Sequence, residues 1–203
     1  MSVSNIWVLA ESADGEPTST TLELLTKARQ LGTGGEVTAF VAGDAAEIVT
    51  ALGDFGATKV YATGDLGGAL PGVAVAAAIK AVIDGGDSPD LILVPQDYVG
   101  RDVVSRLSVH LDRPVLTNNV DVVIEGDAVQ ATTPVFGGTK LVTTTFTGDG
   151  PHLIAVRPKS FAAEAAGGAT PEILAAPVPE LGAVGGAQVV ASHVEEHHGP
   201  KLD

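Results

Sequence analysis

The 203-residue chain contains no cysteine, and this absence excludes several kinds of site at once. Disulfides, thiolate-bound zinc, thiolate-bound iron–sulfur clusters and cysteine nucleophiles are all ruled out. The absence fits a reducing compartment, and we expect a cytoplasmic protein. Aromatic residues are scarce too, at 4%, although hydrophobic residues make up 45% of the chain. This composition favours closely packed layers of helices on a sheet over a bulky aromatic core.

Basic residues and long apolar runs are also in short supply. The chain has 11 Lys and Arg against 25 Asp and Glu, for a net charge of −14. Binding to nucleic acid or to an anionic membrane surface needs a positive field, so neither partner is expected. The longest apolar stretch, Val73 to Ile83, is interrupted by Lys80 and is too short to span a bilayer. The N-terminus lacks the basic region of a signal peptide, and we predict no membrane insertion.

One stretch, residues 90–111, carries the clearest structural signal. A short apolar run from Leu91 to Val94 lies between two prolines, which predicts a buried strand. A polar turn follows at residues 96–102, where Gly100 is suited to unusual backbone angles. Apolar residues then recur at helical spacing up to Leu111, with Asp102 placed to cap the first turn. A strand, a loop and a helix in this order form the unit of an open parallel sheet.

The rest of the chain repeats this unit and then departs from it. Before residue 90, strands are predicted at 5–10, 36–41 and 59–62, and helices at 20–31, 44–52 and 71–83. Thr20 with Glu23, and Asp44 with Glu47, form capping-box patterns ahead of the first two helices. After residue 114 the segments 115–118, 120–124, 128–132, 140–146 and 152–156 are rich in strand formers, and 125–127 is a hairpin turn signal.

This pattern predicts a three-layer α/β fold. We expect a mostly parallel, Rossmann-like (adenine-nucleotide-hydrolase-like) sheet with an antiparallel hairpin extension. Residues 1–161 are expected to form the α/β domain. Residues 162–203 are rich in Ala, Gly, Pro and Glu, which predicts a linker-like, poorly packed tail.

No complete active site is visible in the sequence. The glycine-rich connection from Gly64 to Gly72 lies between a strand and a helix and could cradle an anion on backbone amides, but it contains no Lys, Arg, Ser or Thr. The residues from His193 to His198 include metal-capable types, yet their spacing matches no metal motif, and a solvated tail is the better interpretation. A GxSxG nucleophile elbow is missing as well. We therefore predict no catalytic, cofactor-binding or metal-binding residue on this chain.

A few surface residues could instead contact a partner. Arg101 could bind a partner's carboxylate, or it could pair with Asp97 or Asp102 on its own loop. Phe136, followed by two glycines, could present an aromatic ring to a partner or pack against its own domain. The predicted partner interface consists of Tyr98, Gly100, Arg101, Phe136 and Gly137.

The order of several motifs resembles the alpha subunit of the electron transfer flavoproteins. The similar segments, which together span about residues 5–161, are Val8-Leu9-Ala10-Glu11, LELLTKARQLG at 22–32 with Val37 and Val41-Ala42-Gly43 after it, residues 90–102, Arg106-Leu107, Pro134-Val135-Phe136-Gly137-Gly138, and Val156-Arg157-Pro158 with Phe161. In the family an aromatic residue directly precedes Gly-Arg/Lys-Asp. Here Tyr98 is displaced from Gly100 by one position.

The resemblance implies a subunit of a heterodimeric electron carrier. In that family the alpha subunit pairs with a beta subunit, and an FAD held by the second alpha domain carries electrons from flavin dehydrogenases, such as acyl-CoA dehydrogenases, to the respiratory chain. The present chain would then be the N-terminal scaffold domain, with no FAD-contacting residue of its own and a tail leading to an FAD domain outside this sequence. The alternative is a free-standing nucleotide-binding or hydrolytic α/β module that uses residues 64–72 and 96–102.

Overall fold

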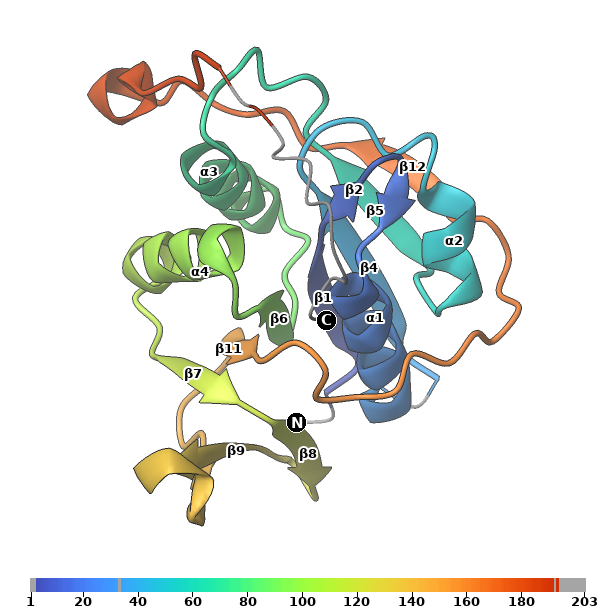
Figure 1. Ribbon diagram of the computed structural model, residues 1–203, viewed down its shortest axis with the longest axis vertical. Helices are drawn as coiled ribbons and strands as arrows, with labels where there is room; N and C mark the ends of the chain where they lie inside the picture. Colours follow the sequence, from blue (N-terminus) through green and yellow to red (C-terminus); the bar gives the residue numbers. More distant parts are fainter. Residues whose placement is uncertain (1–2, 33, 192, 194–203) are drawn as a thin grey trace.

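The computed structural model describes residues 3–32, 34–191 and 193 (Figure 1). The helices are α1 (Ser19–Leu31), α2 (Val49–Asp54), α3 (Pro71–Asp84) and α4 (Tyr98–Leu111), with short 3₁₀ helices η1 (Phe136–Gly138) and η2 (Gly182–Gly186). The strands are β1 (Asn5–Ala10), β2 (Ser12–Ala13), β3 (Glu16–Pro17), β4 (Glu36–Val41), β5 (Lys59–Ala62), β6 (Leu91–Pro95), β7 (Val115–Asn119), β8 (Asp121–Glu125), β9 (Ala128–Val135), β10 (Lys140–Thr145), β11 (His152–Val156) and β12 (Glu172–Ala175).

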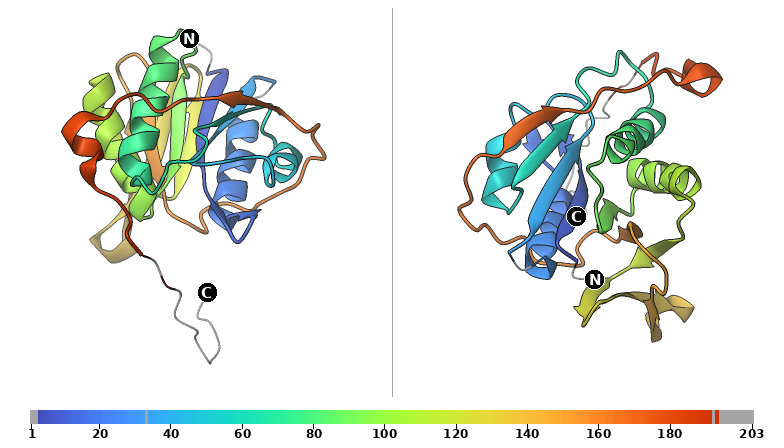
Figure 2. Two further views of the ribbon diagram at one scale, coloured as in Figure 1. Left: turned by 90° about the horizontal axis from the view of Figure 1, so that it is seen from above. Right: turned by 180° about the vertical axis from the view of Figure 1, so that it is seen from behind.

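Seven strands form a parallel central sheet in the order β12-β5-β4-β1-β6-β11-β7. Helices α1 and α2 cover one face, and α3 and α4 cover the other (Figure 2). Strands β1 and β6 are buried along nearly their whole length because helices lie over both of their faces. The predicted three-layer, mostly parallel α/β fold is confirmed.

The antiparallel strands form a sheet of their own, in the order β10-β9-β8. Val122, Val129 and Ala131 of this small sheet are buried in the same core as α1 and α2. Lys27 of α1 also pairs with Asp121 of β8 at 3.0 Å. The small sheet is therefore anchored by β8 and β9, while β10 is exposed at almost every position.

The segment after β11, whose composition predicts a linker-like tail, returns to the central sheet. In Figure 1 it runs around the outside of α1 and α2 to the far edge of the sheet. There β12 pairs in parallel with β5, and Ala176 is completely buried. A run of small residues packs here because glycine lets backbones touch: a Cβ on Gly53 would lie 2.5 Å from the carbonyl oxygen of Ala169. The division of the chain at residue 161 stays a prediction.

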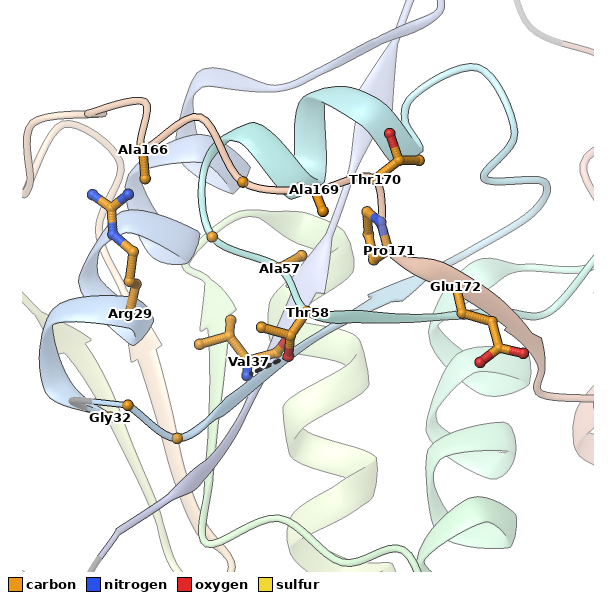
Figure 3. A pocket seen from close by; sticks show the side chains of 15 residues that line it. Arg29, Gly32, Val37, Ala57, Thr58, Ala166, Ala169, Thr170, Pro171 and Glu172 are labelled. Carbon is orange, nitrogen blue, oxygen red and sulfur yellow. Dashed lines mark hydrogen bonds between the residues drawn. The ribbon is translucent and has the colours of Figure 1, made fainter.

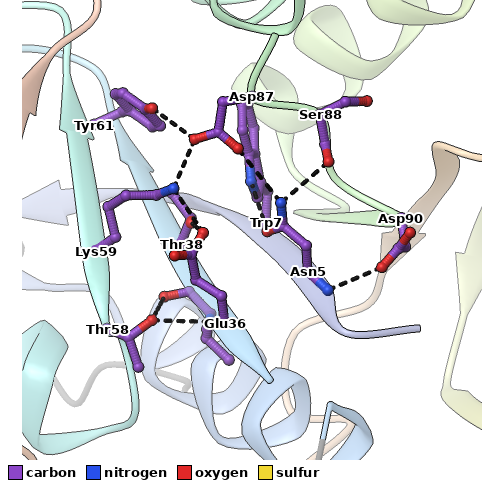
Figure 4. Close-up of polar contacts among 11 residues, drawn as sticks. Asn5, Trp7, Glu36, Thr38, Thr58, Lys59, Tyr61, Asp87, Ser88 and Asp90 are labelled. Atoms are coloured by element: carbon purple, nitrogen blue, oxygen red, sulfur yellow. Dashed lines mark hydrogen bonds and ion pairs between the residues drawn. The ribbon is translucent and has the colours of Figure 1, made fainter. Parts of the chain in front are cut away.

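A polar network ties the amino ends of the central strands to the loop before β6 (Figure 4). Lys59 Nζ lies 2.6 Å from Glu36 and 2.6 Å from Asp87, and the hydroxyl of Tyr61 donates to Asp87 at 2.7 Å. Burial, and then the hydrogen bond and charge of Asp87, raise the pKa of Tyr61 to about 12. Burial opposes the charged form of Asp87, but hydrogen bonds from Lys59 and Tyr61 outweigh it and lower the pKa of Asp87. Three of the scarce aromatic side chains, Trp7, Phe40 and Tyr61, pack against one another, with ring centroids 5.6–6.0 Å apart.

The predicted helix ends are correct where proline or glycine sets them. Helix α3 begins at Pro71, and α1 ends with Gly32 as its C-cap. Both capping-box predictions are wrong. Thr18 caps α1 by accepting from the Thr21 amide. Helix α2 has no side-chain cap because its N-cap residue is the apolar Ile48, while Asp44 lies before the helix and accepts from the Ala46 amide in a local turn.

Candidate functional site

The chain reverses its direction of winding between β1 and β6. From β1 it passes through α1 to β4 on one side, whereas from β6 it passes through α4 to β7 on the other. The loops leaving the carboxyl ends of these two strands therefore diverge, and this is where open parallel sheets bind ligands. Glu11 directly follows β1, and Asp97 follows β6 by two residues. We call the loops at this end of the sheet the carboxyl edge.

Glu11 and Asp97 bring two carboxyl groups together at the carboxyl edge. The pKa of Glu11 is raised to about 8, first because the group is buried and then because of a hydrogen bond to Asp97 and the repulsion of its negative charge. Oε1 of Glu11 is buried and has no hydrogen-bond partner among the described residues. Glu11 therefore keeps its proton to a higher pH than an ordinary carboxyl group does. No role for Glu11 was expected from the sequence, although an acidic residue within two positions of the end of each of two buried strands was the available signal.

Asp97 also starts α4, which corrects two predictions. The loop predicted at 96–102 is mostly helix, because Asp97 caps it by accepting a 2.8 Å hydrogen bond from the Gly100 amide. Asp102 is thus not the cap; it lies within α4 and pairs with Arg106 at 2.8 Å. Gly100 is buried in the first turn of the helix, where a Cβ would lie 2.0 Å from the Pro95 carbonyl oxygen. Glycine is needed here for close approach, not for a turn conformation.

Tyr98 and Arg101 form an exposed pair on the first turn of α4. Tyr98 is 86% exposed, and the Arg101 guanidinium lies over its ring at 5.1 Å from the centroid. Arg101 Nε donates to the Asp97 backbone carbonyl at 3.0 Å. No carboxylate in the described part of the chain lies within 4 Å of the Arg101 guanidinium. The ion pair with Asp97 or Asp102, weighed from the sequence, is not formed, so the charge of Arg101 faces solvent.

Hydrogen bonds of two polar side chains connect the carboxyl ends of β6, β7 and β11. The side-chain oxygen of Gln96 accepts from the Asn118 amide at 2.9 Å, and the Gln96 amide donates to Val156. Asn119 is completely buried; its amide group donates to the Ala155 carbonyl at 2.9 Å and accepts from the Thr133 hydroxyl at 2.8 Å. These bonds join β6, β7 and β11 to β9 and fix the small sheet beside the carboxyl edge. Nothing in the sequence pattern pointed to Asn119.

The other predicted interface residues lie on the small sheet. Phe136 is 79% exposed and has a left-handed backbone conformation, and Gly137 follows it in η1. The ring therefore does not pack into its own domain. On the next strand, Leu141 and Val142 are 65% and 45% exposed. Tyr98 and Arg101 belong to α4 and Phe136 and Gly137 to the β9–β10 connection, so the predicted interface divides between two separate elements.

The carboxyl edge offers little to hold a phosphate or a metal ion. In the Gly64–Gly72 connection, Asp65 accepts from the Gly67 amide at 2.8 Å, so a side chain of the loop already uses that donor. Within the described residues, no group of three or more His, Asp or Glu side chains could hold a metal ion. Residues 194–198 of the predicted solvated tail lie outside the described residues. Across the described part of the chain, none of the helices has the length and apolar character needed to cross a membrane.

Comparison with known proteins gives a consistent result. A model of the electron transfer flavoprotein domain family matches residues 6–181. The electron transfer flavoprotein subunit alpha of Mycobacterium tuberculosis is 31% identical over 172 residues, which are 84% of this chain and 52% of the relative. The corresponding subunit of Clostridium acetobutylicum is 29% identical over 163 residues, or 77% of this chain and 48% of the relative. Protein FixB of Clostridium saccharobutylicum is 28% identical over a similar range. The chain thus spans about half the length of the curated relatives it matches.

Proposed function

Because this chain belongs to the electron transfer flavoprotein domain family, we propose that it is the N-terminal scaffold of an alpha subunit. In this role it pairs with a beta subunit to support a heterodimeric carrier whose FAD accepts and donates electrons. The carrier would take electrons from flavin dehydrogenases such as acyl-CoA dehydrogenases and pass them to the respiratory chain. FAD supplies the redox chemistry when bound, and the residues described here supply position and contacts.

The observation that carries this proposal is the pair of carboxyls at the point where a doubly wound sheet would bind a nucleotide. A diphosphate at this position would need amide or cationic donors. Glu11 and Asp97 place two carboxyl groups there instead, together with the negative charge of Asp97. The carboxyl edge therefore does not fit FAD or a free nucleotide, which disfavours the alternative of a nucleotide-binding or hydrolytic module. A scaffold whose flavin is held elsewhere is consistent with this arrangement.

For the partner surface, the strongest candidate is the Tyr98–Arg101 pair. Tyrosine and arginine are enriched among the residues that dominate binding energy. Since Arg101 has an exposed charge and no carboxylate partner among the described residues, it is suited to a carboxylate of the beta subunit. Gly100 contributes by keeping the first turn of α4 close to Pro95. Phe136 and Gly137 would extend the contact onto the small sheet.

Mixing the chain with a matching beta subunit tests the proposal. We expect a 1:1 complex on a sizing column, weakened at least tenfold by Arg101→Glu and by Tyr98→Ala, since each of the two residues would contribute more than ~1.4 kcal/mol. Lys80→Gln is the matched control, because Lys80 is a partly exposed basic residue on α3 that pairs with Asp84. Failure of the wild-type chain to bind would refute the scaffold role. Equal affinity of all variants would refute only the assignment of the surface.

Titration with FAD and AMP tests the carboxyl edge independently of the partner. Flavin fluorescence and calorimetry should show no saturable binding of either ligand to this chain. Stoichiometric retention of FAD would overturn the placement of the flavin elsewhere. Tight binding of AMP would favour the free-standing module.

A further inference from the structure

A crevice lies at the opposite end of the sheet from the carboxyl edge. It has a volume of about 460 Å³ and is bounded by the C-terminal ends of α1 and α2, the residues that lead into β4 and β5, and the segment 166–172 (Figure 3). A volume of this size suits a small ligand. Its position separates it from the surface assigned to the beta subunit.

We call residues 161–171 the strap. The crevice exists because the backbone of the strap lies directly on the backbone of α2. A Cβ on Gly168 would lie 2.3 Å from the carbonyl oxygen of Gly53, so the strap and α2 touch without side chains between them. The strap is held by hydrogen bonds from the Ala166 amide to the Asp54 carbonyl and from the Glu164 amide to the Thr26 hydroxyl. Glycines also line the floor of the crevice, which leaves space that side chains would otherwise fill.

Arg29 is the one cationic residue among the described residues that line the crevice. Its aliphatic stem packs against Gly56, where a Cβ would lie 3.1 Å from two carbons of Arg29. Its Nη2 donates to the Glu164 carbonyl at 3.1 Å. Nη1 is buried and has no hydrogen-bond partner in the described chain. Figure 3 shows the guanidinium beneath the strap near Ala166, with the Glu172 carboxylate on the opposite side of the crevice and directed away from it.

A buried guanidinium nitrogen without an acceptor requires an explanation, since nearly all such groups are satisfied in folded proteins. The last turn of α1 accounts for the charge of Arg29, because a cation there offsets the helix dipole. The dipole does not account for Nη1, which still lacks an acceptor atom. An oxyanion in the crevice would provide this acceptor. Its charge-assisted hydrogen bond with Arg29 would be stronger than the repulsion that the C-terminal end of α1 exerts on an anion.

We infer that the crevice between α1, α2 and the strap binds a small oxyanion, a phosphate or carboxylate group, with Arg29 as its principal ligand. The group would accept from Nη1 of Arg29 and lie against the glycine backbone of the crevice. Binding would also hold the strap against α1, because Nη2 of the same guanidinium already contacts the strap.

The test uses inorganic phosphate and acetate in separate titrations, with chloride added to keep ionic strength constant. Amide NMR shifts of Gly56 and Gly168 report on the crevice, and thermal unfolding reports on binding. We expect saturable shifts with at least one of the two anions, and a melting temperature higher by about 3–5 °C at ten times the dissociation constant. Preference for phosphate or for acetate identifies which group the crevice takes.

Four variants decide the role of Arg29. Arg29→Gln should weaken binding at least tenfold, and Arg29→Lys, which keeps the charge and the stem, should weaken it less. Ala169→Leu should also weaken binding by filling the crevice, whereas the control Lys80→Gln should change nothing. Absence of saturable shifts with both anions would overturn the inference. Full retention of binding in both Arg29 variants would do so as well.

Discussion

Glu11 makes the stability of this protein depend on pH in a direction opposite to that of most acidic residues. Its pKa is raised from the ordinary 4.5 to about 8 in the folded chain. A group whose pKa is higher in the folded state than in the unfolded state contributes stability that is complete below the unfolded value. That stability is lost as the pH rises from about 4.5 through 8. The whole shift corresponds to at most ~5 kcal/mol, but Glu11 is partly exposed, so solvent screening reduces the expected effect to ~1–2 kcal/mol.

Glu11→Gln removes this dependence while keeping the shape of the side chain. The amide can donate to Asp97 as the protonated carboxyl does. We expect the variant to be more stable than wild type by ~1–2 kcal/mol at pH 8.5 and within ~0.5 kcal/mol of it at pH 5. Urea unfolding at a series of pH values measures the difference.

Two further variants locate the cause of the Glu11 effect. Asp97→Asn keeps the cap on α4 but removes the neighbouring charge, so it should lower the pKa of Glu11 and flatten the same curve. Glu16→Gln, at an exposed position in β3, is the control and should follow wild type. Parallel curves for wild type and Glu11→Gln between pH 5 and 9 would refute the assignment of a protonated Glu11 to the carboxyl edge.

Three other predictions follow from packing. Gly100→Ala should destabilise the fold by ~2–3 kcal/mol because the added Cβ meets the Pro95 carbonyl, whereas Gly148→Ala, in open space, should change the unfolding midpoint little. Asp87→Asn should lower the pKa of Tyr61 below its value of about 12. Phenolate absorbance measures this pKa in a Tyr98→Phe background, with Asp84→Asn as the control. An unchanged pKa in Asp87→Asn would rule out the Tyr61–Asp87 contact. A chain ending at residue 161 should be less stable than one ending at residue 181 by ~2 kcal/mol, because it loses the β12 ladder and the buried Ala176. Equal urea midpoints would instead support residue 161 as the domain boundary.

The strands were predictable from the sequence because each buried strand is a short apolar run bounded by turn residues. Leu91–Pro95 and Asn5–Ala10 need no long-range information to be recognised. Helix starts were less predictable because the sequence offers more acceptable caps than the fold uses. Thr18 and Thr20 are both acceptable caps for α1, and only Thr18 is used. Asp44 is an acceptable cap for a helix that in the structure begins only at Val49. The same holds for Asp97 and Asp102, of which only the first is near enough to the end of β6 to cap α4.

The role of the C-terminal segment could not be read from composition, since Ala and Gly are typical both of linkers and of backbone packed on backbone. Gly53 and Gly168 acquire meaning only when the strap lies on α2. Likewise, Glu11 and Asp97 are 86 positions apart in the sequence, and only the parallel pairing of β1 with β6 brings their loops together. What the sequence could not supply was which distant loops meet.

The two ends of the sheet differ in the type of buried polar atom that has no hydrogen-bond partner among the described residues. Within the part of the chain that the structure describes, a buried carboxyl oxygen of Glu11 lacks a donor at the carboxyl edge, and a buried guanidinium nitrogen of Arg29 lacks an acceptor at the crevice. The Glu11–Asp97 pair therefore disfavours an anion between the ends of β1 and β6, where this architecture ordinarily binds phosphate, while the opposite end of the sheet offers a donor to one. If the chain serves as a scaffold, its partner contacts and its small-molecule contacts are thus separated by the length of the sheet. A substitution at Arg29 should then leave binding of the beta subunit unchanged, and a substitution at Arg101 should leave the crevice intact.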